Sequence, residues 1–126
     1  MTSYASEVFR LSFPEGWLFR EDPGALSLWK STSGGAITVS TLLGDVEADA
    51  RARAERFAAE QGLDQPRVSG GRAKAEAAFD LADGGWCRLL ILARGRRLVF
   101  ATYTTRDPDA AEEDEVERIF ATLSLL

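Results

Sequence analysis

The sequence predicts one α+β domain in which an antiparallel meander sheet packs against two helices. Three observations indicate this class: short segments with alternating apolar residues, two longer segments with helical spacing, and turn residues between successive strands. The chain has 126 residues, the size of one ordinary domain. We therefore expect residues 1–126 to form a single domain.

The first part of the chain is expected to form four short strands. Phe9, Leu11 and Phe13 alternate with polar residues, which is typical of a strand with one buried face. The segments Pro14-Glu15-Gly16 and Asp22-Pro23-Gly24 supply turn residues. The expected strands are 8–13, 17–20, 26–29 and 36–42, the last being rich in β-branched residues.

A helix is expected over residues 46–61, because apolar residues recur there at helical spacing. Asp45 is placed to cap its start, and Gly62 is placed to end it. The apolar stripe consists of Val46, Ala50, Ala54, Phe57 and Ala58. Since most of these side chains are small, the helix can pack closely on the sheet.

Three further strands are expected at 73–81, 86–93 and 98–104, joined by turns at Asp83-Gly84-Gly85 and Arg94-Gly95-Arg96. The segment 86–93 is apolar on both sides apart from Arg88, which indicates a central strand covered on both faces. Whether the two helices cover one face of the sheet or both is left open by the pattern.

A second helix is expected after Asp107. Either Asp107 caps it with Pro108 in the first helical position, or Asp109 caps it and Glu112 completes a capping box. Its apolar stripe consists of Val116, Ile119, Phe120 and Leu123. The carboxylates of residues 107–115 are explained by the dipole of this helix, and their spacing does not match a calcium loop.

The composition argues against most catalytic and metal chemistry. The chain has no histidine, which removes histidine-dependent nucleophilic catalysis and histidine-ligated zinc. Its one cysteine, Cys87, lies in an apolar strand and is expected to be a core residue. We therefore expect no catalytic residues, no metal, no cofactor and no enzymatic activity.

The charge and hydropathy of the chain favour a cytoplasmic protein. The net charge of −5 lacks the attraction to phosphate that nucleic-acid binding requires. The N-terminus lacks the basic start and apolar run of a signal peptide, and no segment reaches the ~20 apolar residues of a membrane helix. We expect neither nucleic-acid binding nor membrane insertion.

Two places are candidate binding sites. Trp29 ends an expected strand and lies next to Lys30 and the Ser/Gly-rich loop 31–35, where an exposed tryptophan is a common protein contact. Arg94, Arg96 and Arg97 form a basic turn suited to an acidic partner.

The motif Phe13-Pro14-Glu15-Gly16-Trp17 resembles the PsbP-like superfamily, as does the order of elements over nearly the whole chain. The superfamily includes a photosystem II extrinsic protein, a Ran-binding release factor, and bacterial DcrB-like and Eag-type chaperone domains. The segment 116–124 is similar to the family's last helix running into an extended tail. The resemblance implies an αβα sandwich that acts by binding rather than by catalysis.

The leading hypothesis is therefore a non-catalytic protein-binding or adaptor domain, whose partner is another protein or a second copy of the chain. A small apolar-ligand carrier is the alternative, with a pocket between the sheet and the helix 46–61, where the alanine stripe leaves room. A carboxylate- or arginine-dependent enzyme is the third hypothesis, although no pair of carboxylates stands out in the sequence.

Overall fold

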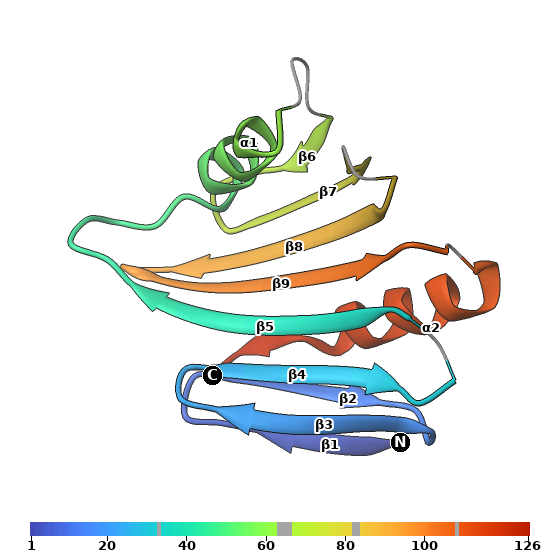
Figure 1. The fold of residues 1–126 in the computed structure, drawn as a ribbon. Helices are drawn as coiled ribbons and strands as arrows, with labels where there is room; N and C mark the ends of the chain where they lie inside the picture. The colour runs from blue at the N-terminus through green and yellow to red at the C-terminus, as the bar shows by residue number, and fades with distance from the viewer. Residues whose placement is uncertain (33, 63–66, 82–83, 108) are drawn as a thin grey trace.

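A seven-stranded antiparallel sheet forms the centre of the computed structural model, with strand order β3-β4-β5-β9-β8-β7-β6 (Figure 1). A three-stranded sheet, β1-β2-β10, lies behind it. The structure describes residues 1–32, 34–62, 67–81, 84–107 and 109–126. The strands are β1 Thr2–Ala5, β2 Phe9–Phe13, β3 Trp17–Asp22, β4 Ala25–Lys30, β5 Ala36–Leu43, β6 Val68–Gly70, β7 Lys74–Asp80, β8 Trp86–Arg94, β9 Arg97–Thr105 and β10 Ser124–Leu125, and the helices are α1 Ala50–Glu60 and α2 Ala110–Thr122.

The predicted fold class is confirmed, and the helices lie on opposite faces of the large sheet. α2 and the small sheet bury Leu28, Ile37 and Leu90 on one face, which we call the α2 face. α1 packs over Leu89 and Ile91 on the other, the α1 face. Because consecutive residues of β8 point to opposite faces, both sides of this strand are buried, as its apolar sequence predicts.

The seven predicted strands are present, with ends that differ by up to two residues, and three short strands were not predicted as such. β1 and β6 have no alternating apolar pattern, since each buries at most part of one side chain. β10 is the extended tail after the last helix, and it pairs with β2. Asp22 lies in β3, so the turn is confined to Pro23 and Gly24, the latter at φ +75°. Asp83, in the predicted β7–β8 turn, lies outside the described residues.

The predicted start of α1 is wrong by one helical turn. Asp49 caps the helix by accepting a hydrogen bond from the Ala52 amide at 3.1 Å. Asp45 and Val46 precede it in a segment whose amides bond to the β8–β9 turn: Gly44 to the Arg96 carbonyl and Ala48 to the Gly95 carbonyl. Val46 is 76% exposed, so it does not belong to the buried stripe.

α2 begins after Asp109, which accepts a hydrogen bond from the Ala111 amide at 2.8 Å. This confirms Asp109 rather than Asp107 as the cap; Pro108 lies outside the described residues. The predicted capping box is wrong, because Glu112 turns inward to the sheet and bonds to Tyr103. Val116, Ile119 and Phe120 are buried as predicted.

α1 covers only part of its face of the sheet. It packs on β6, β7 and β8, while β3, β4 and β5 lie in the foreground of Figure 1 with none of the described elements over them. This uncovered half of the α1 face carries Leu18, Arg20, Ser27, Trp29, Thr38 and Ser40. Leu18 is 48% exposed there.

Candidate functional site

Trp29 and Lys30 are neighbours in sequence but lie on opposite faces of β4. Trp29 is half-buried on the uncovered half, directly across from Leu18 of β3. Lys30 lies on the α2 face, where its Nζ donates to Glu115 Oε1 at 2.9 Å. Trp29 therefore belongs to the open surface, whereas Lys30 helps to join β4 to α2.

Glu115 receives a second hydrogen bond, from the indole Nε1 of Trp17 at 2.6 Å. The Lys30 ammonium also lies 5.9 Å from the centre of the Trp17 ring. The bond from Trp17, followed by the bond from Lys30, holds the pKa of Glu115 below its usual value. These contacts give Trp17 and Lys30 a structural role in attaching β3 and β4 to α2.

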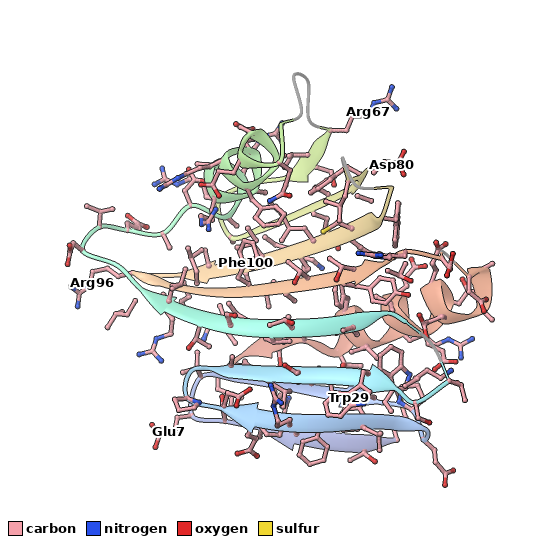
Figure 2. The ribbon with its side chains drawn as sticks, in the orientation of Figure 1. Glu7, Trp29, Arg67, Asp80, Arg96 and Phe100 are labelled. Atoms are coloured by element: carbon pink, nitrogen blue, oxygen red, sulfur yellow. The ribbon has the colours of Figure 1, made fainter. Side chains whose placement is uncertain are left out.

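The basic turn lies at the other end of the sheet from Trp29, as the labels of Trp29 and Arg96 in Figure 2 show. Ala36 at the start of β5 pairs with Trp29, and Leu43 at its end pairs with Arg97. The two positions are seven steps apart along β5, a distance of roughly 23 Å. The two predicted places therefore do not form one site.

A groove of about 500 Å³ opens beside the basic turn, between α1 and the ends of β5 and β9. We call it the α1 groove. Its lining residues are Leu42, Leu43, Gly44, Val46, Glu47, Ala48, Asp49, Ala52, Arg53, Arg56, Arg96 and Leu98. The alanine stripe of α1 does not contribute, because Ala50, Ala54 and Ala58 are fully buried. The space lies on the flank of the helix rather than beneath it.

Arg96 is the predicted site residue that lines the α1 groove. Arg94 is exposed at the end of β8, and Arg97 is half-buried at the start of β9. Two further residues of the groove were not predicted: Arg53, which α1 brings there, and Val46, which the helical spacing assigned to the buried stripe. The signal available was that five of the seven residues 42–48, which precede the capping Asp49, are apolar or small.

Cys87 and the acidic segment behave as structural residues. Cys87 is fully buried, and burial raises the pKa of its thiol to about 11. Glu112 is buried at the start of α2, and Tyr103 donates a short hydrogen bond to its Oε2. Burial and this bond raise the pKa of the Tyr103 hydroxyl. Among the described residues, no three Cys, Asp or Glu side chains gather closely enough to hold a metal ion.

No helix within the described part of the chain is both long and apolar enough to cross a membrane.

Of the predicted site residues, Trp29 and Arg96 lie on open surfaces of the α1 face, one at each end of β5.

Comparisons with known proteins bear on the fold. Neither a family model nor a curated protein sequence matches the chain. A solved structure of a protein from Bacteroides thetaiotaomicron is similar, with a TM-score of 0.64 and 18% sequence identity. The similarity covers 94% of this chain but 45% of that protein, so this chain spans less than half of its length. The likeness shows a shared α+β fold, and the resemblance to the PsbP-like superfamily stays a prediction.

Proposed function

We propose that the chain is a non-catalytic protein-binding domain, and that its partner is a second copy of the chain joined through the outer edge of β3. The observation that carries the proposal is this edge. β3 has six residues and ends the large sheet, and among the described residues its backbone pairs only with β4. Such an edge is a template for another strand.

The two edges of the large sheet differ in length and in exposed apolar surface. β6, at the opposite edge, has only three residues and lies beside α1. On β3, Leu18 and Phe19 are each 48% exposed, one on each face. Short edge strands are a common protection against unwanted pairing, so the longer apolar edge is the better candidate for a contact.

One antiparallel register suits two copies of β3. With Phe19 opposite Phe19 of the second copy, Leu18 lies opposite Arg20, and Trp17 lies opposite Glu21. Phe19 is already part of an aromatic cluster, 6.2 Å from Tyr4 and 5.8 Å from Phe13 between ring centres. The pairing would extend this cluster across the interface, and cross-strand aromatic pairs stabilise sheets.

The neighbouring registers place like charges opposite each other. A shift by one pair in one direction sets Arg20 against Arg20. A shift in the other direction brings Glu15, in the turn before β3, level with Glu21. Like charges directly opposite are unfavourable in a sheet, so the charges of residues 15–21 favour the Phe19-centred register.

The absence of histidine and the burial of Cys87 support a role without catalysis. We also infer a cytoplasmic location, which is consistent with a single free cysteine. Both inferences belong to the proposal.

Light scattering after size-exclusion chromatography tests the proposal over a wide range of protein concentration. We expect the mass of a dimer at high concentration and a monomer for Phe19→Lys, which places two positive charges opposite each other. Thr38→Lys is the matched control. It adds the same charge to β5, on the uncovered half of the sheet, and leaves β3 unchanged.

Dimers of Thr38→Lys with the mass and affinity of the wild type are expected. A monomeric wild type at every concentration would overturn the proposal, as would a stable complex with a different protein that leaves the chain otherwise monomeric. Loss of the dimer in Thr38→Lys but not in Phe19→Lys would show pairing through the sheet face instead of the edge.

A further inference from the structure

The α1 groove has an apolar floor and wall. Leu42 and Leu98 come from neighbouring positions on β5 and β9, where they pair directly. Leu43 and Val46 continue the apolar surface and are 64% and 76% exposed. The groove volume of about 500 Å³ lies in the range that small-molecule ligands occupy.

The wall of the groove is held in place by backbone hydrogen bonds. The Gly44 amide donates to the Arg96 carbonyl at 2.9 Å, and the Ala48 amide donates to the Gly95 carbonyl at 2.7 Å. The Asp49 carboxylate then fixes the first turn of α1. A preformed wall reduces the entropy that a ligand would lose on binding.

Arg53 is the least satisfied charged group in the groove. Its guanidinium lies 5.1 Å from the centre of the Phe100 ring, and its Nη1 is buried without a hydrogen-bond acceptor among the described residues. A buried donor that lacks an acceptor is costly, so a carboxylate that reaches this side chain would gain a charge-assisted hydrogen bond.

The other charges leave the groove mildly positive. Arg96 has no acidic partner among the described residues, whereas Arg56 is 3.5 Å from Glu60. Asp49 is committed to the Ala52 amide and to Arg72 at 3.7 Å. Two uncommitted arginines therefore face one uncommitted carboxylate, Glu47, in a chain whose net charge is −5.

We propose that the α1 groove binds a small anionic amphiphile, a free carboxylate with an apolar chain. The apolar chain of the ligand lies on Leu42, Leu98 and Val46. Its carboxylate lies between Arg53 and Arg96. The apolar surface supplies the driving force for binding, and the arginines select the charge of the headgroup. This site is separate from β3 and does not depend on the proposed self-association.

Titration calorimetry with decanoate below its micelle concentration tests the site, with decanol and decyltrimethylammonium as neutral and cationic ligands. We expect decanoate to bind at one site per chain, and to bind more tightly than either of the others. Its affinity is expected to fall about tenfold in Arg53→Gln, the loss typical of one charge-assisted hydrogen bond. Decanol binding should stay unchanged in that variant.

Arg96→Gln provides a second test on an exposed turn, where the fold does not depend on the side chain, and we expect it to weaken decanoate in the same way. Ala52→Phe should block the groove and abolish binding. Arg118→Gln, on the exposed side of α2, is the matched control and should bind as the wild type does.

Three results would overturn the inference. One is the absence of decanoate binding to the wild type, and another is equal affinity for decanoate and decanol. The third is binding that survives Ala52→Phe, which would place the ligand elsewhere on the surface.

Discussion

Two carboxylates of α2, Glu112 and Glu115, attach the helix to the sheet in different ways. Glu115 accepts from Trp17 and Lys30 at the partly exposed end of β3 and β4. Glu112 is buried and accepts from the Tyr103 hydroxyl. Of the two, only Glu112 lies in the first turn of α2, where the helix dipole favours an acidic residue. Each nevertheless makes a specific contact with the sheet.

The Glu115 contacts predict a pH-dependent stability. Because the folded pKa of this carboxyl is below its ordinary value of 4.5, the contacts stabilise the fold above that pH and are lost as the pH falls through the folded pKa. We expect Glu115→Gln to lower the free energy of unfolding by about 1 kcal/mol near neutral pH. The difference should shrink toward zero at strongly acidic pH.

Urea unfolding of the wild type and of Glu115→Gln, at neutral pH and at strongly acidic pH, measures this difference in the free energy of unfolding. Glu117→Gln, at an exposed position of the same helix, serves as the control and should change little. An equal deficit of Glu115→Gln at both pH values would contradict the assignment of the contact.

Gly35 shows why the position of Glu112 was out of reach of sequence reasoning. A Cβ at Gly35 would lie 2.7 Å from both Glu112 Oε2 and the Tyr103 hydroxyl oxygen. Gly35, which is distant in sequence from Tyr103 and Glu112, therefore shares one crowded space with both side chains. The local pattern at Glu112 fits a capping box equally well, and only the folded sheet distinguishes the two.

At the level of elements, strongly periodic segments were predictable and short edge strands were not. β7 buries Ala75 and Ala77, as its alternation predicts, and β8 is covered on both faces. β1 and β6 depend on neighbouring strands for their pairing rather than on a buried face of their own. The α1 groove was equally unpredictable from sequence, because its wall exists only if α1 begins at residue 50 rather than at residue 46.

α1 gives the clearest test at this scale, since Asp45 and Asp49 are one helical turn apart and both fit a capping position. The structure assigns the cap to Asp49. We expect Asp49→Ala to destabilise the protein by about 1 kcal/mol, the usual cost of losing a capping side chain. Asp45→Ala should change the free energy of unfolding very little.

Urea unfolding of the two variants at neutral pH makes the comparison. A larger loss in Asp45→Ala than in Asp49→Ala would mean that the helix begins near residue 46 in solution, as the spacing alone predicts. The α1 groove would then lose the wall formed by residues 44–49.

At the level of the whole molecule, the two faces of the large sheet are covered unequally. The α2 face is closed by a helix and a second sheet, whereas the α1 face is open over β3–β5. The apolar pattern of β8 predicted that both faces are covered at the centre of the large sheet. It carried no information about the cover over the edge strands. The proposed binding surfaces lie where this cover stops.

Hydrogen exchange along β3 is the sharpest test of self-association through this edge. Alternate amides of residues 17–22 point away from β4, and pairing with a second copy would bond them. We expect their exchange to slow as protein concentration rises, while the amides of β6 keep the same rate. Exchange in β3 that is independent of concentration, in samples that contain dimers, would contradict the account.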